Sequence, residues 1–435
     1  MTGTLWRGVI VGALAGLLFG FDTAVIAGTT EGLRRAFDLD ATGVGITVSS
    51  ALWGTLLGAI FAGQPGDRYG ARACLRWVAG LYLLSGLGCF LAPSWGALIA
   101  FRFLAGIAVG ASSVLAPVYL SEIAPPARRG ALVGAFQFNI VFGILIAYLS
   151  NYLVGLAELG AFDWRVKFGI TALPAALLLA LLYAIPQSPR WLALRGRQTE
   201  ALLVMERIGV VDPEAEIAAI DAVGEKGSAR LSWSRHKRPI LLAITVAMFN
   251  QLSGINAILY YLNDIFAAAG FDGVSADKQA IAIGAMNLLF TGLALTVIDR
   301  LGRRTLLLIG AVGLTATLAG VAAIMITGQH RDLLLYLLAG FIAFFAFSQG
   351  AVIWVYIAEV FPTEVRARGQ ALGSGTHWLM DAIIATGFPV IAAHSAGAPF
   401  AFFAAMMALQ FVVVWIFFPE TKRLPLDRRI PDAAA

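Results

Sequence analysis

The chain has 435 residues, of which 59% are hydrophobic and only 13% are charged. Soluble domains carry about 25% charged residues, so a soluble protein of this composition would expose more apolar surface than water tolerates. The length suffices for about twelve membrane-spanning helices of about 20 residues each. The sequence therefore predicts a polytopic, all-α membrane protein embedded in a lipid bilayer.

The charge and the metal-binding side chains exclude further classes of protein. The net charge is only +5, and the basic residues lie in loops rather than on one face, which excludes a nucleic-acid-binding protein. No cysteine or histidine spacing typical of a metal site occurs, so we expect no metal and no other cofactor. The first apolar run continues through Asp22, which favours a first span over a cleaved signal peptide.

Six apolar runs precede a polar stretch and six follow it. The stretch contains amphipathic pieces, which predict short surface helices. We therefore predict an N-terminal six-helix half at 1–188, a helical linker at 189–237, a C-terminal six-helix half at 238–420 and a tail at 421–435. The predicted spans lie at about 6–28, 43–64, 74–92, 96–119, 130–153, 166–185, 238–268, 279–298, 305–327, 333–357, 370–393 and 399–418.

The loop charges predict the orientation in the membrane. The side that holds both termini and the linker carries 24 lysines and arginines, whereas the other side carries six. Basic loops stay in the cytoplasm. We therefore expect a multi-pass protein of the plasma membrane with both termini in the cytoplasm.

The two halves repeat each other at offsets of 232 to 237 residues. An internal repeat in a twelve-span protein is typical of a secondary transporter whose site lies near the midplane between the halves. The matching segments are Asp67-Arg68-Tyr69-Gly70-Ala71-Arg72 with Asp299-Arg300-Leu301-Gly302-Arg303-Arg304, Glu122 and Arg129 with Glu359 and Arg366, and Pro186-Gln187-Ser188-Pro189-Arg190 loosely with Pro419-Glu420-Thr421-Lys422.

Several further motifs occur in order along the chain. They run from Gly16-Leu17-Leu18-Phe19-Gly20-Phe21-Asp22, through the Pro-x-Ser-Pro-Arg-Trp-Leu run at 186–192, to Gln251 with Gly254-Ile255-Asn256 and Tyr260-Tyr261. With these motifs the whole chain resembles the sugar porter family of the major facilitator superfamily, which includes bacterial sugar/proton symporters and animal glucose facilitators. The resemblance implies two six-helix repeats that transport a monosaccharide by alternating access, as a monomer.

Asp22 is a carboxylate in the middle of an apolar span, which is costly unless the group is paired or wet. Arg102 is the one basic residue that lies inside a predicted span rather than at its end, so it is the natural partner. The resembling proton symporters have an Asp and an Arg at these positions, whereas the facilitators have an Asn in place of the Asp. Our hypothesis is that Asp22 carries the coupled proton. The alternative is a static buried ion pair.

Neutral amides and aromatic rings suit a sugar, which has many hydroxyls and apolar ring faces but no charge. On an ideal helix Gln251 and Asn256 point about 140° apart, so they share a face only if the helix unwinds at Gly254. The alternative is hydrogen bonding between spans. The substrate-binding residues that the resemblance implies or favours are Gln137, Asn250, Gln251, Asn256, Tyr260, Asn287, Trp354, His377 and Trp378.

Asp381 lies four residues after His377 and so on the same helix face. In the resembling proteins the position of Asp381 is usually neutral. We consider three roles for it: a second titrating group, a contact that orients His377, or a group that faces a wet cavity.

Charged clusters at the cytoplasmic helix ends form a separate set. By resemblance they are salt bridges between helices that open and close the cytoplasmic side. The chain departs from the family pattern at Ala71, Gln187 and Ala351, where an Arg, a Glu and a Pro are usual, and the first two weaken the N-terminal set. The gating residues are Asp67, Arg72, Glu122, Arg129 and Arg190, with Asp299, Arg303, Glu359 and Arg366.

The resulting expectation is a proton-coupled symporter that imports a monosaccharide, either a hexose or a pentose. A proton-independent facilitator with the same fold is the main alternative. A non-transporting sugar sensor is disfavoured because the tail after Pro419 is short, and a multidrug antiporter because of the many amides. We do not expect an enzyme, since the spans contain no nucleophile–base or metal constellation.

Overall fold

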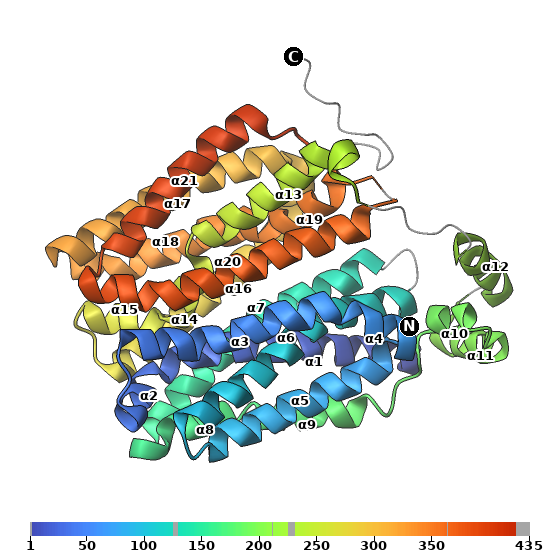
Figure 1. Cartoon of the computed structure of the whole chain (residues 1–435), viewed down its shortest axis with the longest axis horizontal. Coiled ribbons are helices and arrows are strands. Elements are labelled where there is room, and N and C mark those ends of the chain that lie inside the picture. The colour runs from blue at the N-terminus through green and yellow to red at the C-terminus, as the bar shows by residue number, and fades with distance from the viewer. Residues whose placement is uncertain (1, 125–128, 211, 225–230, 363, 423–435) are drawn as a thin grey trace. The chain divides into compact units, whose positions relative to one another are not determined.

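A computed structural model describes residues 2–124, 129–210, 212–224, 231–362 and 364–422. These residues form α-helices and short 3₁₀ helices, and no strand occurs among them. Within these ranges, twelve helical stretches are long and apolar enough to cross a membrane. The all-α, twelve-span architecture predicted from the sequence is confirmed (Figure 1).

The helices follow the predicted order of spans, linker and spans. The first six spans comprise α1 (Gly3–Val25) with η1 (Ile26–Gly28), α3 (Ala41–Phe61), α5 (Ala71–Leu91), α6 (Trp95–Ile123), α7 (Arg129–Leu156), and η3 (Gly160–Phe162) with α8 (Asp163–Gly169) and α9 (Ala172–Leu181). The last six comprise α13 (Trp233–Leu252) with α14 (Ile255–Tyr260), α16 (Gly273–Leu301), α17 (Arg303–Thr327), η4 (Arg331–Leu333) with α18 (Leu334–Phe347) and α19 (Gln349–Val360), α20 (Arg366–His394) and α21 (Ala398–Phe417). Short connecting helices are α2 (Thr30–Phe37), α4 (Gly63–Tyr69) and α15 (Leu262–Ala268).

The chain folds into two compact units. Unit 1 consists of Met1–Val25, Ser50–Ala147 and Phe162–Gly227, and unit 2 consists of Ile26–Ser49, Tyr148–Ala161 and Ser228–Ala435. Unit 1 therefore holds most of the first six spans, and unit 2 holds the last six. Two segments from the first half of the sequence pack with unit 2. The predicted boundaries after residues 188, 237 and 420 stay predictions.

Within unit 1, α3 and α6 pack through glycines. A Cβ atom on Gly106 would lie 1.8 Å from the main-chain oxygen of Ala51, and one on Gly110 would lie 2.0 Å from that of Thr55. Real side chains do not approach a backbone oxygen so closely. Small residues spaced four apart let the two helix backbones touch, which is a common means of helix association in membranes.

Within unit 2, a hydrophobic core lies between α13, α17, α19 and α21, which Figure 1 shows as neighbouring helices. Leu306 and Val352 are fully buried in it. At its edge the ring of Tyr356 stacks on Phe418, with centroids 5.2 Å apart. The charged helix ends described below lie beside this core.

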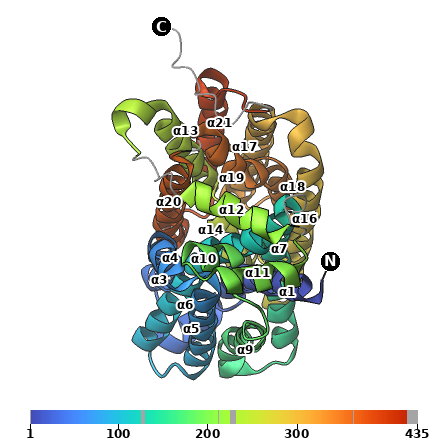
Figure 2. The same cartoon turned by 90° about the vertical axis from the view of Figure 1, so that its right-hand side faces the viewer.

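The linker forms three short helices, as the sequence predicts. They are α10 (Pro189–Leu194), α11 (Gln198–Ile208) and α12 (Pro213–Gly224), and Figure 2 shows them grouped together. Their shared core contains Leu192, Met205 and Ile217. The linker helices belong to unit 1, where Gly209 lies beside Thr2 at the start of the chain.

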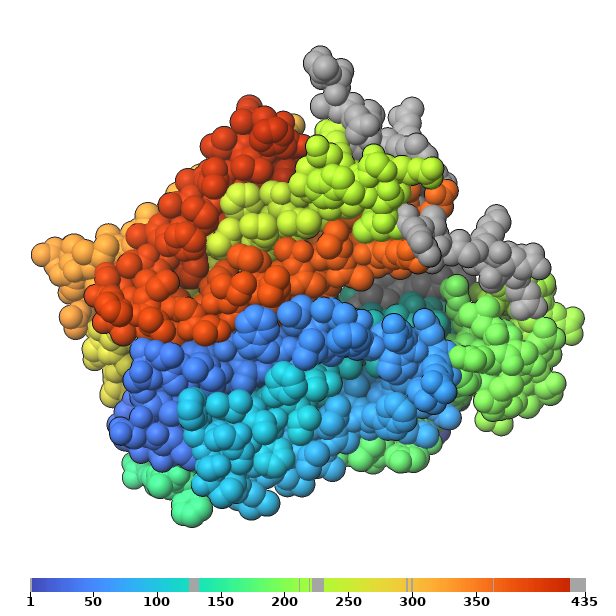
Figure 3. Space-filling model, in the orientation of Figure 1, coloured from blue at the N-terminus to red at the C-terminus, as the bar shows by residue number. Residues whose placement is uncertain are grey.

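The outer surfaces of the spans are apolar. On α5, Trp77, Leu84 and Leu91 are 59%, 50% and 70% exposed, and Figure 3 shows this helix on the surface of unit 1. Side chains of this size and number would be unfavourable against water but are suited to lipid.

The glycine packing predicts a difference between two identical substitutions. Gly106→Ala should lower the free energy of unfolding by about 1–3 kcal/mol, because the added methyl group meets a backbone oxygen that cannot move aside. Gly80→Ala in α5 is the matched control, since nothing lies within 4 Å of its Cβ position, and it should be neutral or stabilise by about 0.5–1 kcal/mol. Thermal unfolding in detergent measures both. Equal effects would contradict the glycine-mediated contact.

Candidate functional site

Asp22 of α1 and Arg102 of α6 form a buried ion pair in unit 1. Arg102 Nη1 lies 3.0 Å from Asp22 Oδ1 and 3.1 Å from Oδ2. The side chain of Arg102 is 3% exposed and that of Asp22 is 7% exposed. The Arg102 guanidinium also lies over the ring of Phe168, 5.2 Å from its centroid. The structure thus brings together the acid and the base that the sequence predicts as partners.

The seventh span breaks at Gly254. Gly254 has φ of 80°, a conformation that favours glycine, and it separates α13 from α14. A Cβ at this position would also lie 2.2 Å from the Phe403 ring. The predicted unwinding therefore occurs, and it frees Gln251 and Asn256 from the geometry of a continuous helix.

Gln251, on the N-terminal side of the break, contacts α20. Gln251 Nε2 donates to His377 Nε2 at 2.9 Å, and both side chains are buried. An amide nitrogen only donates, so this contact requires a neutral His377 that carries its proton on Nδ1. The His377 ring contacts two indoles, with centroid distances of 5.1 Å to Trp354 and 5.0 Å to Trp378. Four predicted substrate residues are therefore neighbours within unit 2.

Asp381 is the second polar contact of α20. Its Oδ2 accepts hydrogen bonds from Asn256 Nδ2 at 2.9 Å and from the Tyr260 hydroxyl at 3.0 Å. Among the described residues no hydrogen bond or ion pair joins Asp381 to His377, so nothing there supports the second of the three roles considered for Asp381, a contact that orients His377. The two side chains share a helix face but bind different partners.

The remaining predicted substrate residues are spread over both units. Asn250 of α13 and Asn287 of α16 are buried in unit 2. Gln137 of α7 is half-buried in unit 1. All three lie in spans, as the sequence predicts.

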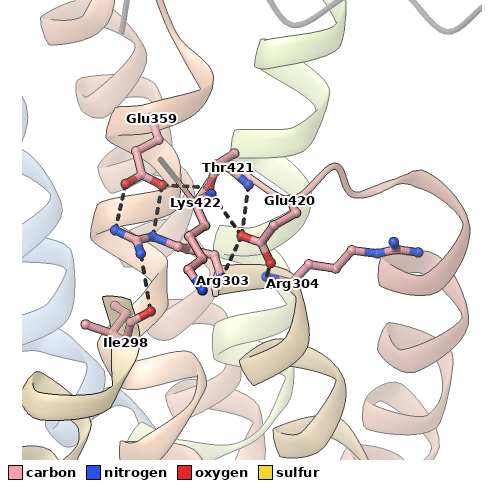
Figure 4. A network of polar contacts seen from close by, with 7 residues as sticks. All are labelled: Ile298, Arg303, Arg304, Glu359, Glu420, Thr421 and Lys422. Carbon is pink, nitrogen blue, oxygen red and sulfur yellow. Dashed lines mark hydrogen bonds and ion pairs between the residues drawn. The ribbon is translucent and has the colours of Figure 1, made fainter. Parts of the chain in front are cut away.

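The charged helix ends of unit 2 form a continuous network (Figure 4). Arg303 makes a bidentate pair with Glu359, through Nη2 to Oε1 at 2.8 Å and Nε to Oε2 at 3.1 Å. Glu420 accepts from the backbone N–H groups of Arg303 and Arg304, at the start of α17. Thr421 donates its hydroxyl to Glu359 and closes the network. A carboxylate at a helix N-terminus accepts hydrogen bonds from free N–H groups and interacts favourably with the positive end of the helix dipole.

The corresponding helix ends of unit 1 lack two of these charges. Gly70 repeats the conformation of Gly302, with φ of 82° against 91°. Gln187 occupies the place of Glu420 and donates Nε2 to the Tyr69 carbonyl at 3.1 Å. Ala71 stands at the repeat position of Arg303.

Glu122, the repeat counterpart of Glu359, therefore has different neighbours. It interacts with the Ser188 hydroxyl and with the charge of Arg190. Glu122 and Arg190 are both in the predicted gating set, and their role in gating stays a prediction. Two substitutions in the sequence thus account for the different networks of the two units.

The other predicted gating residues make main-chain contacts. Arg72 donates to the carbonyl of Ile185 at 2.9 Å, and Arg366 donates to that of Ala358 at 3.0 Å. Asp67 is exposed, and its carbonyl accepts from Trp191. The side chains of Arg129 and Asp299 lie outside the described residues.

An ion pair that sequence reasoning missed joins α2 to α15 within unit 2. Arg34 Nη1 lies 2.5 Å from Asp264 Oδ1. Nearby, the Tyr148 hydroxyl donates to the Leu259 carbonyl at 2.9 Å. Arg34 and Tyr148 both come from the first half of the sequence, so these contacts hold first-half segments to second-half helices. The sequence offered little signal for this pair, since Arg34 lies in a predicted loop and Asp264 lies near the end of the predicted span at 238–268.

Burial raises the pKa of the Asp264 carboxyl above its usual range, and the charge of Arg34 acts against that rise. The carboxylate therefore gains a proton at a higher pH than an exposed aspartate does. The ion pair is complete above this pKa and is lost as the pH falls through it.

The two helix-end networks predict unequal effects of one substitution. Glu359→Gln should lower the free energy of unfolding by about 3 kcal/mol, because it leaves Arg303, only 8% exposed, without its anion. Glu122→Gln is the matched change in unit 1 and should cost less, since no arginine stands at position 71. Thermal unfolding in detergent compares the two variants. A larger effect at Glu122 would refute this account.

The Arg34–Asp264 pair predicts a pH-dependent coupling. A double-mutant cycle with Arg34→Gln and Asp264→Asn should give a coupling energy of about 1 kcal/mol near pH 8, because the pair is only partly exposed. The coupling should shrink as the pH falls through the raised pKa of the Asp264 carboxyl, because the carboxylate then takes up a proton. Unfolding midpoints over a series of pH values measure it. A coupling that grows on acidification would show that the pair is not the source.

The chain is similar to known transporters over almost its full length. The family described as "Sugar (and other) transporter" matches residues 8–429. The D-xylose-proton symporter of Escherichia coli (strain K12) is 33% identical, covering 96% of this chain and 93% of the symporter. The glucose transport protein of Synechocystis is also 33% identical, covering 96% and 95%. The inward-open structure of the xylose transporter XylE from E. coli has a TM-score of 0.87 at 31% identity, covering 97% of this chain and 98% of that one. The chain therefore belongs to the sugar porter family of the major facilitator superfamily, a family of multi-pass membrane transporters.

Proposed function

We propose that the protein is a proton-coupled symporter that imports a monosaccharide, a hexose or a pentose, by alternating access. Relatives named as a D-xylose-proton symporter, a D-xylose transporter and a glucose transport protein support a sugar of this size. The Asp22–Arg102 ion pair is the observation that carries the proton coupling.

The pair can couple a proton to a movement of helices. When Asp22 takes up a proton, the anion opposite a buried guanidinium disappears. An unpaired buried charge costs several kcal/mol, so Arg102 must find another partner or reach water. The protonated state therefore favours a different packing of α1 against α6. Loss of the proton restores the attraction and the original arrangement.

The proposed sugar ligands combine donors, acceptors and ring faces. Each amide offers one carbonyl acceptor and two N–H donors, which suits a pair of sugar hydroxyls. The indoles offer apolar faces for the C–H side of the sugar ring. The proposed set is Gln137, Asn250, Gln251, Asn256, Tyr260, Asn287, Trp354, His377 and Trp378.

The charged helix ends act as the proposed cytoplasmic gate, whose ion pairs form in one state and break in the other. The excess of basic residues on one side supports a plasma-membrane protein with both termini in the cytoplasm. The protein works as a monomer in this proposal, and its chemistry is transport rather than catalysis.

Uptake into proteoliposomes tests the proposal. The panel contains labelled glucose, galactose, xylose, arabinose, fructose and myo-inositol, with and without an inward proton gradient. The wild type should accumulate one sugar above its outside concentration only when the gradient is present. Asp22→Asn should equilibrate that sugar without accumulation, because an amide cannot carry the proton. Sugar-driven alkalinisation of the medium is the second measurement.

Asp332→Asn is the control, since Asp332 is exposed and lies in the short 3₁₀ helix η4 at the start of the tenth span. It should accumulate sugar as the wild type does. A wild type that only equilibrates the sugar at every pH would be a facilitator. Accumulation by Asp22→Asn would remove Asp22 from the proton path.

A further inference from the structure

Asp381 is a buried carboxylate inside a span that the proton pathway proposed above does not use. It is 1% exposed and lies on α20, one helical turn from His377. An acid at such a position is costly and points to a function. Its surroundings decide which function that is.

The groups that contact Asp381 are neutral. Asn256 and Tyr260, both on α14, donate to Oδ2. No ion pair to Asp381 is recorded in the part of the chain that the structure describes. The nearest titratable group on its own helix is His377, which is bound to Gln251. Asp381 therefore differs from Asp22, which faces an arginine.

The second oxygen of Asp381 has no partner. Oδ1 is fully buried and makes no hydrogen bond to any described residue, and the same holds for Nδ2 of the buried Asn250. Buried polar atoms normally have partners, because an unmade hydrogen bond costs about 1–3 kcal/mol. The unmatched acceptor on α20 points to a ligand that donates a hydrogen bond to it.

We propose that Asp381 Oδ1 accepts a hydrogen bond from one hydroxyl of the transported sugar and so determines which sugars bind. The inference rests on the proposed function and adds a specificity-determining residue to it. Asn256 and Tyr260 hold Oδ2 and thereby orient the carboxylate. The indoles of Trp354 and Trp378 lie beside His377, which is one helical turn from Asp381.

A carboxylate acceptor has a chemical signature. An ionised carboxylate can only accept, so the sugar group opposite it must donate. A hydroxyl donates, whereas a fluorine or a hydrogen in its place cannot. The deoxy and the deoxyfluoro analogue at the contacted position should therefore both bind poorly. A protein group that donates would instead tolerate fluorine better than hydrogen.

The first arm of the experiment uses the wild-type transporter. Monodeoxy and monodeoxyfluoro analogues of the transported sugar compete with its labelled form in proteoliposomes. At one ring position both analogues should bind about tenfold to 100-fold more weakly than the parent sugar, which is the range for a hydrogen bond to a charged group. If every position tolerates fluorine, the proposal is wrong, whatever a variant does.

The second arm compares Asp381→Asn with Asp332→Asn. Asp381→Asn should bind the parent sugar about tenfold more weakly and reduce the discrimination at that one position to about threefold or less. Asp332→Asn makes the same chemical change at an exposed acid outside the proposed site and should keep the full discrimination. Thermal unfolding in detergent confirms that both variants are folded.

Two other results would overturn the inference. Unchanged discrimination in Asp381→Asn would place the contact elsewhere. A lower proton-to-sugar ratio in Asp381→Asn with an unchanged analogue pattern would make Asp381 a second titrating group instead. A wild type that moves no sugar removes the proposed function and this inference together, whereas transport without discrimination removes the inference alone.

Discussion

A charge inside an apolar helix bundle needs a partner, and this constraint governs the polar structure of the protein. Asp22 and Arg102 are almost fully buried and pair with each other across α1 and α6. Neither could be there alone, because an isolated ion in such surroundings costs several kcal/mol. Loss of either charge would leave the other buried without its partner, and this is the basis of the proton coupling proposed above.

The same constraint appears at the helix ends, where the two halves satisfy it unequally. In unit 2, Arg303 has a bidentate carboxylate partner, and Glu420 accepts from the start of α17. In unit 1 the repeat positions hold Ala71 and Gln187, so an amide replaces the second carboxylate and the arginine is missing. The duplicated backbone remains, including the left-handed glycines Gly70 and Gly302. The repeat thus preserves the helix geometry while the strength of the charge network differs.

Breaks in the spans determine which residues the neutral polar side chains contact. Gly254 separates α13 from α14, and the amides on its two sides contact different residues of α20. The tenth span breaks at Ser348, between α18 and α19, although no proline stands in this stretch. Ser348 donates its hydroxyl to the Phe344 carbonyl, and Gly310 of α17 leaves it room. The tenth span thus breaks without a proline, at a serine whose side chain packs against a glycine.

The sequence alone determined the twelve spans, the helical linker, the repeat and the Asp22–Arg102 pairing. Each depends on local hydrophobicity or on the rarity of a charge in an apolar run, and both can be read from residue order. The tertiary structure decided which partners the polar side chains take. His377 and Asp381 share a helix face, yet they bind Gln251 and Asn256, because the break at Gly254 sets the direction of each amide. The Arg34–Asp264 pair joins residues 230 positions apart. No local pattern encodes such a contact, since it depends on how distant segments pack in space.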